Sequence, residues 1–66
     1  MQDMEYSAFV PRHTPLIGKT LEEIQKEFGI MIEKETPHKE FHAMENFKAR
    51  GNYMKIREFR HKYDLF

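Results

Sequence analysis

The chain has 66 residues, enough for a single domain, and it contains no cysteine. Its core must be small, and neither a disulfide nor a cysteine-based zinc site can reinforce it. The 11 basic and 11 acidic side chains balance, so net charge provides no general attraction to nucleic acid or to anionic lipid. Association with a second copy is the remaining common way to stabilise so small a domain, and we therefore expect a homodimer.

The N-terminal residues show no pattern of a targeting segment. Residues 1–5 include two acids and precede no apolar run of the length found in signal peptides. The longest uninterrupted apolar stretch has three residues, as at 30–32, whereas about 20 are needed to cross a bilayer. We therefore expect a cytoplasmic protein that does not insert into a membrane.

The first expected element is a strand over residues 5–10, which are rich in strand-forming side chains. It ends at Pro11, because proline has no backbone N–H to donate to a sheet. In such a strand Tyr6 and Phe9 point to opposite faces. At least one of these two rings must therefore lie outside the core or be covered by a partner.

Residues 11–19 contain two prolines and a glycine and are typical of a loop, in which we expect Leu16 and Ile17 to point inwards. The loop runs into Gly-Lys-Thr at 18–20, which is part of the consensus of a phosphate-binding loop. That motif also requires a glycine five positions before its second glycine, where this chain has His13. We therefore interpret the tripeptide as a turn followed by a helix cap.

The clearest expected helix follows this loop. Thr20 and Glu23 form a T-x-x-E capping box, in which each side chain accepts a hydrogen bond from the other residue's backbone. Apolar side chains then recur on one helical face, at Leu21, Ile24 and Phe28. Gly29 can adopt the left-handed conformation that ends a helix. The apolar run 30–32 after it predicts a short buried strand.

The second half of the chain begins with an exposed connection at 33–40. Residues 45–50 alternate in a way that favours a half-buried strand, while residues 39–44 are compatible with either a strand or a helix. Asn52 follows Gly51 and is a good N-cap for a second helix. The apolar stripe of this helix is Ile56, Phe59, Tyr63 and Phe66. The expected fold is a small α+β domain with a mostly antiparallel sheet and two helices.

Three basic residues precede the first expected helix, namely Arg12, His13 and Lys19. The free N–H groups and the dipole of a helix N-terminus favour anions. We therefore take these residues as candidate contacts for a small anionic or nucleotide ligand. The alternative is an ordinary surface loop whose charges balance Glu22 and Glu23.

Metal and catalytic chemistry are the weakest interpretations. His38 and His42 would share one face of a helix, but zinc needs a third or fourth protein ligand, and the sequence nominates none. No Ser-His-Asp, Cys-His or paired-carboxylate arrangement can be singled out. We therefore expect a protein that is not an enzyme and that holds no metal and no resident cofactor.

Residues 48–62 form a basic segment with a single acid, Glu58. Its basic residues are Lys48, Arg50, Lys55, Arg57, Arg60, His61 and Lys62. A solvated helix face is the simplest interpretation. The alternative is a surface with which a small adaptor contacts a protein or a nucleic acid.

The six Phe, three Tyr and five Met residues are more large apolar groups than one small core is expected to enclose. Exposed apolar patches usually mark an interface, and methionine suits contacts that must adapt. The residues that we expect at a dimer interface are Tyr6, Phe9, Met31 and Phe66.

Two segments carry a family resemblance. The first segment covers residues 6–32, where the chain reads Pro-Leu-Ile-Gly-Lys-Thr-Leu-Glu-Glu-Ile at 15–24 and then Gly-Ile-Met-Ile at 29–32. This pattern resembles the TrkA-C or RCK-C domain of potassium-transport regulators, with its P-L-[VI]-G-K-T-L-x-E-[LI] loop and helix. The closing G-D-x-L-x-V-x-G strand of that family resembles residues 44–51, with Met44 at its first glycine.

The resemblance implies one TrkA-C-like regulatory domain over residues 1–66, with the element order β-α-β-β-α. It further implies a module that dimerises and senses a small ligand on behalf of a cation channel or antiporter subunit. In some members of the family the ligand is cyclic di-AMP, bound across the dimer interface. No ligand residue is transferred from the family to this chain.

Overall fold

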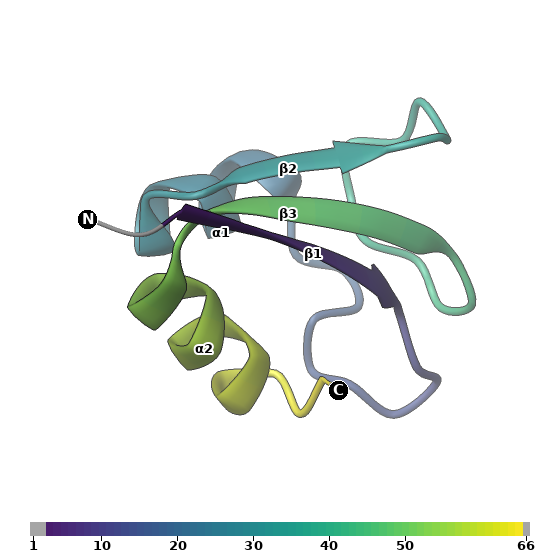
Figure 1. Cartoon of the computed structure of the whole chain (residues 1–66). Coiled ribbons are helices and arrows are strands. Elements are labelled where there is room, and N and C mark those ends of the chain that lie inside the picture. The colour runs from purple at the N-terminus through teal and green to yellow at the C-terminus, as the bar shows by residue number, and fades with distance from the viewer. Residues whose placement is uncertain (1–2, 66) are drawn as a thin grey trace.

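The computed structural model describes residues 3–65 of the chain. Its elements are β1 (Asp3–Phe9), α1 (Leu21–Phe28), β2 (Met31–Lys34), β3 (Asn46–Asn52) and α2 (Tyr53–Lys62). The strands form one antiparallel sheet in the order β1-β3-β2, so β3 lies in the middle and is flanked by both other strands (Figure 1). This architecture confirms the expected α+β domain with an antiparallel sheet and two helices.

Both helices pack against the same face of the sheet. The inner face carries Tyr6, Ile32, Phe47 and Ala49, and these side chains share one core with buried residues of α1 and α2. Phe59 of α2 touches Phe47 at 6.1 Å between ring centroids, and it touches Phe28 of α1 at 5.5 Å. The core predicted from helical spacing is therefore confirmed for Ile24, Phe28, Ile56 and Phe59, while Leu21 lies half-buried at its margin.

Helix α1 has the ends that its sequence predicts. The Thr20 hydroxyl oxygen accepts from the Glu23 N–H at 3.1 Å, and the Glu23 carboxylate accepts from the Thr20 N–H at 3.3 Å. Gly29 ends the helix with φ of 65° and ψ of 37° and donates its N–H to the Gln25 carbonyl. The capping interpretation of Thr20 is thus confirmed.

The loop between β1 and α1 is held in place from its middle. Thr14 is buried, and its hydroxyl donates to the carbonyl of Tyr63, just after α2. The same oxygen accepts from the Leu16 N–H at 3.2 Å, which turns Leu16 into the core. Ile17 is 39% exposed, so the expectation that it also points inwards is wrong. The loop is thus anchored by two buried residues, Thr14 and Leu16.

The connection from β2 to β3 is organised around the carboxylate of Glu45. It accepts from the ammonium of Lys34 at 3.1 Å, from the hydroxyl of Thr36 at 2.8 Å and from the N–H of His42 at 2.6 Å. The Lys34 side chain is 1% exposed and also donates to the Glu40 carbonyl. Burial raises the pKa of Glu45, but the hydrogen bonds from His42, Thr36 and Lys34 outweigh it, so the pKa is lowered overall.

Residues 39–44, compatible with either a strand or a helix by sequence, form neither. The Leu21 N–H donates to the Lys39 carbonyl, and the Phe41 N–H donates to the Lys19 carbonyl, which makes a single short bridge beside Thr20. Phe41 is buried through this bridge and contacts Phe47. The conformation of this segment is therefore set by backbone pairing with residues 19–21, which are distant in the sequence.

A bulge marks the start of β3. Met44 has φ of 68°, its N–H donates to the Val10 carbonyl, and the Val10 N–H donates to Glu45. Two residues of the β3 side thus oppose one residue that follows β1, and the first of them is left-handed. A left-handed backbone is uncommon for methionine, because only glycine adopts it without steric cost.

Helix α2 begins directly at the end of β3. The side chain of Asn52 accepts from the Met54 N–H at 2.9 Å, which confirms Asn52 as the N-cap. At the other end Lys62 and Tyr63 both donate to the carboxylate of Glu27 and so connect α2 to α1. Phe66, predicted in the same apolar stripe, lies outside the described residues. No helix within residues 3–65 is long and apolar enough to span a membrane.

Candidate binding surface on the outer face of the sheet

The outer face of the sheet is the face that the two helices leave uncovered. Strand alternation places on it the side chains of Asp3, Glu5, Ser7 and Phe9 from β1, Met31 and Glu33 from β2, and Asn46, Lys48 and Arg50 from β3. All of these residues are exposed, while the residues between them face the core. The two faces of one sheet therefore have opposite chemistry.

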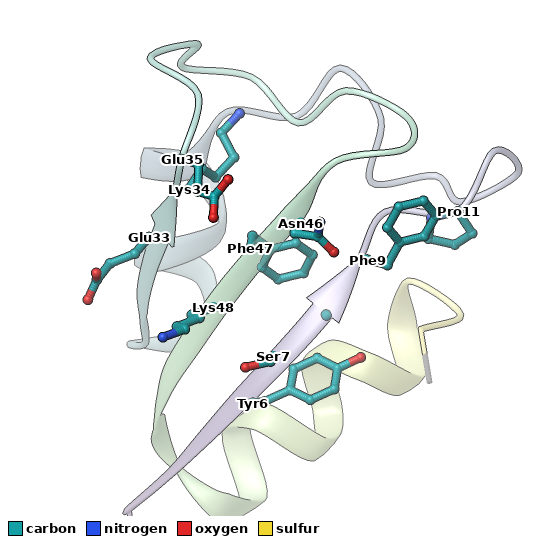
Figure 2. A pocket seen from close by; sticks show the side chains of 11 residues that line it. Tyr6, Ser7, Phe9, Pro11, Glu33, Lys34, Glu35, Asn46, Phe47 and Lys48 are labelled. Atoms are coloured by element: carbon teal, nitrogen blue, oxygen red, sulfur yellow. The ribbon is translucent and has the colours of Figure 1, made fainter.

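A shallow groove crosses this face near the end of β1 (Figure 2). Phe9 and Pro11 lie beside each other and form its apolar wall. Glu33 and Glu35 line the opposite side, Lys48 lies on the same side as Glu33, and Asn46 and Phe47 lie between the two sides. The remaining lining comes from Tyr6, Ser7, Ala8 and Lys34. A ring, a cation and two carboxylates thus meet around one depression, which is a typical arrangement for recognition of an amphipathic ligand.

Next to the groove, Glu5 and Arg50 form a cross-strand ion pair. Their carboxylate oxygen and guanidinium nitrogen are 2.9 Å apart, on the exposed face. The hydrogen bond from Arg50 lowers the pKa of Glu5, with a smaller contribution from the charge of Lys48. The guanidinium of Arg50 is therefore already bonded to Glu5, whereas the ammonium of Lys48 makes no hydrogen bond or ion pair among the described residues. Lys48 is therefore the cation of this face that remains available to a ligand.

The three residues predicted to contact an anion lie at the two ends of the loop between β1 and α1. Lys19 lies beside the start of α1, where its ammonium is 3.9 Å from Glu23. Arg12 and His13 are exposed in the turn after β1, and within residues 3–65 their side chains form no hydrogen bond or ion pair with each other or with Lys19.

The N-terminus of α1 is also a poor anion site. The Leu21 N–H is taken by the Lys39 carbonyl, and the Glu23 N–H is taken by Thr20. Glu22 and Glu23 add negative charge in the first turn. An anion there would meet few free donors and two carboxylates, so the helix-terminus argument for Lys19 loses its basis.

The expected interface residues have different environments. Phe9 is 45% exposed and Met31 is 64% exposed, and both lie on the outer face. Tyr6 is only 9% exposed, with its ring packed edge-on to Phe47 and under the guanidinium of Arg60, 4.6 Å away. The side chain of Tyr6 therefore belongs to the core. Phe66 lies outside the described residues.

The basic segment 48–62 is divided between two surfaces. Lys48 and Arg50 lie on the sheet, while the remaining basic residues are on α2. On the helix, the ammonium of Lys55 is 4.0 Å from Glu58, and Lys62 pairs with Glu27. The segment thus does not form one continuous basic face.

The rings of His38 and His42 lie 4.7 Å apart between centroids, in the connection between β2 and β3. Within residues 3–65 no three side chains of the kinds that bind metals gather at one point. The histidine pair is thus not accompanied by the additional ligands that a zinc site needs.

Sequence reasoning missed most of the groove. The alternation of Lys48 with Phe47 and Ala49 was enough to place Lys48 on the outer face. The positions of Glu33 and Glu35 depend on the pairing of β2 with β3, in which Glu33 lies opposite Lys48. That pairing could not be derived from local patterns.

No family model, no curated protein and no solved structure matches this chain. The functional argument therefore depends on the residues of the chain itself and on the motif resemblance described above.

Proposed function

We propose that this chain is a small cytoplasmic regulatory module that binds an anionic, nucleotide-like ligand as a homodimer and modulates cation transport, potassium transport in particular. The proposal names a binding function and not a catalytic one. It combines the motif resemblance with the chemistry of the groove on the outer face.

The observation that carries the link to the TrkA-C family is the backbone at Met44. The family has glycine at this position, and this chain has a left-handed residue there, with φ of 68°. The element order β-α-β-β-α is also the order that the resemblance implies. The resemblance rests on residues 6–32 and 44–51. The bulge connects these two segments, because Met44 and Glu45 exchange hydrogen bonds with Val10, just after β1. These features support the proposed family relationship.

The groove supports a ligand with an aromatic base and a negative charge. Phe9 offers an exposed ring on which a base can stack, and Lys48 offers an unpaired ammonium in the same depression. Arg12 directly follows Pro11 in the chain and is exposed, but it does not line the groove. The carboxylates of Glu33 and Glu35 can accept hydrogen bonds from the amino group of a base. Stacking combined with basic side chains is a common mode of nucleotide recognition.

Isothermal titration calorimetry with cyclic di-AMP tests this proposal. We expect saturable binding by the wild type, and we expect Phe9→Ala to weaken it by about 5- to 150-fold through the loss of stacking. Met31→Ala is the matched control, because Met31 is exposed on the same face but does not line the groove. The absence of binding by the wild type, or equal losses in both variants, would contradict the proposal.

The alternative, an adaptor that uses the basic segment on a protein or a nucleic acid, has less support. Lys55 and Lys62 are paired with acids, and Lys48 and Arg50 lie on the sheet and not on α2. An affinity for single- or double-stranded nucleic acid that falls steeply with salt would favour this alternative over the groove.

A further inference from the structure

The two edges of the sheet are protected differently. At the β2 edge the side chain of Gln25 on α1 accepts from the Ile32 N–H at 2.9 Å and so occupies an outward-facing donor. Strand β1 forms the other edge (Figure 1), has seven residues and contains no proline. A long edge strand whose backbone groups stay unpaired is a template for pairing with another strand.

The hydrogen bonds of Val10 show which backbone groups of β1 face this edge. Val10 exchanges hydrogen bonds with the bulge at the start of β3, so its N–H and C=O groups point towards β3. Because the direction alternates along an antiparallel pair, those of Tyr6 point the same way, and those of Glu5 and Ser7 point outwards. No other residue within 3–65 hydrogen-bonds to the outward groups of Glu5 and Ser7.

The side chains beside this edge are acidic. Asp3 and Glu5 are the charged residues of β1, and both are exposed on the outer face. Arg50 bonds to one oxygen of Glu5, while the other oxygen and the Asp3 carboxylate make no hydrogen bond or ion pair with another described residue. Cross-strand pairs of opposite charge stabilise a sheet, and like charges destabilise it. A basic strand is therefore favoured next to β1, whereas a second copy of β1 would add acids and no base.

We propose that the β1 edge binds an extended basic segment of a partner protein, which joins the three-stranded sheet as a further antiparallel strand. The segment carries basic residues opposite Asp3 and Glu5, and a neutral residue opposite Ser7, where Lys48 is the neighbour on β3. The antiparallel direction matches the two strand pairs that the sheet already contains. This inference goes beyond the proposed function, because it requires neither a second copy nor a nucleotide-like ligand.

The inner side of the edge requires different side chains in the partner. Met4 and Ala8 pack against the core but are only partly buried, so apolar surface of the edge strand remains uncovered. The guanidinium of Arg60 lies 4.6 Å from the centroid of the Tyr6 ring and adds a positive charge on this side. The partner's side chains that face the helices are therefore apolar and uncharged. An alternation of basic and apolar residues, the period of a half-buried strand, is the expected partner sequence.

A peptide blocked at both ends, Leu-Thr-Ser-Val-Lys-Val-Lys, has this pattern, with its leucine opposite Phe9 and its last lysine opposite Asp3. Isothermal titration calorimetry at low salt measures its binding. We expect Asp3→Asn/Glu5→Gln to weaken binding by about 2- to 30-fold through the loss of two cross-strand charge pairs. Glu22→Gln/Glu58→Gln is the matched control, because it removes as many exposed carboxylates from the two helices. No binding by the wild type at millimolar peptide, or an equal loss in the control, would overturn the inference.

Two peptides that differ only in the place of one N-methyl group test the backbone pairing at constant charge. In the proposed register the lysine opposite Glu5 donates its N–H to the Glu5 carbonyl, whereas the N–H of the valine opposite Tyr6 points away from β1. Methylation of that lysine nitrogen should weaken binding to the wild type by about 2- to 13-fold for the lost hydrogen bond alone. Methylation of the valine nitrogen should have little effect. Equal effects of the two methyl groups would overturn the proposed strand pairing.

The peptide Asp-Met-Glu-Tyr-Ser-Ala-Phe, which copies residues 3–9, tests a second copy as the occupant. We expect it to bind more weakly than the basic peptide, and equally tight binding would overturn the choice of a basic partner. Amide hydrogen exchange with the basic peptide locates the contact. The N–H groups of Glu5 and Ser7 should gain protection, whereas that of Ile32, already bonded to Gln25, should not change. Unchanged exchange at Glu5 and Ser7 in the presence of bound peptide would place the peptide elsewhere and overturn the inference.

Discussion

The inner and outer faces of the sheet come from the same three strands, yet their side chains make different kinds of contact. On the inner face Phe47 contacts the rings of Tyr6, Phe41 and Phe59, and its neighbours are buried. On the outer face the side chains are exposed, and the contacts are an ion pair and a shallow groove. Stability is therefore concentrated on one face, and the other is free to change for binding.

Two phenylalanines, one on each face, give the sharpest test of this contrast. Phe47→Ala removes a buried ring and should lower the free energy of unfolding by about 3–5 kcal/mol, a large share of the stability of a small domain. Phe9→Ala removes a half-exposed ring and should cost less than about 1 kcal/mol. Urea denaturation of both variants measures the difference. Similar losses would show that the outer face is also part of the core.

The Glu45 network should produce the next largest effect. Glu45→Ala leaves the nearly buried ammonium of Lys34 without its counter-charge, and it should cost about 3 kcal/mol. Glu33→Ala, a carboxylate of the outer face, is the matched control and should change stability by less than about 0.5 kcal/mol. Thermal or urea melts distinguish the two variants. A small effect at Glu45 would mean that water solvates Lys34 after the change.

The same carboxylate predicts a pH dependence. The folded-state pKa of Glu45 is lowered, so its contribution is present above the unfolded-state pKa of about 4.3 and is lost as pH falls through the folded value. Stability measured from pH 6 down to pH 3 should therefore fall more for the wild type than for Glu45→Gln. Parallel curves for the two proteins would show that Glu45 does not couple folding to protonation.

A smaller effect is expected at the cap of α1. Thr20→Ala removes the hydroxyl that accepts from the Glu23 N–H and should cost about 1 kcal/mol. Thr20→Ser keeps the acceptor and should retain most of the stability. Equal losses in both variants would indicate that the methyl group matters more than the hydrogen bond.

The smallest effect is expected at the ion pair of the outer face. Arg50→Ala removes the pair with Glu5, whose atoms are exposed, and should change stability only slightly, and less at high salt. The measurement is a urea melt at low and at high salt. A loss comparable to that of Phe47→Ala, and persisting in salt, would show that this face contributes to folding as the inner face does.

The features that depend on neighbouring residues were predictable from the sequence. The capping box at Thr20, the left-handed Gly29 and the N-cap at Asn52 are all short-range, and the structure contains each of them. Helical spacing also identified Ile24 and Phe59 as core residues. Such signals lie within a few positions of one another, so no knowledge of the tertiary pairing is needed to find them.

The features that depend on distant residues were not predictable. Phe41 is buried because residues 39–41 bridge to the start of α1, some twenty positions earlier. The bulge at Met44 requires Val10 as its partner. The groove depends on the pairing of β2 with β3, which sets Glu33 opposite Lys48. The network around Glu45 also joins residues that are distant in sequence, since Lys34 and Thr36 both donate to its carboxylate.

The measurement that tests the central claim most directly is a titration of the isotope-labelled chain with cyclic di-AMP, followed by amide chemical shifts. The account predicts that the shifted amides cluster around the groove, at Phe9, Asn46 and Lys48, with the exposed face of α2 unchanged. Shifts concentrated on Met54, Arg57 and His61 of α2, or no shifts at saturating ligand, would contradict the assignment of binding to the outer face of the sheet.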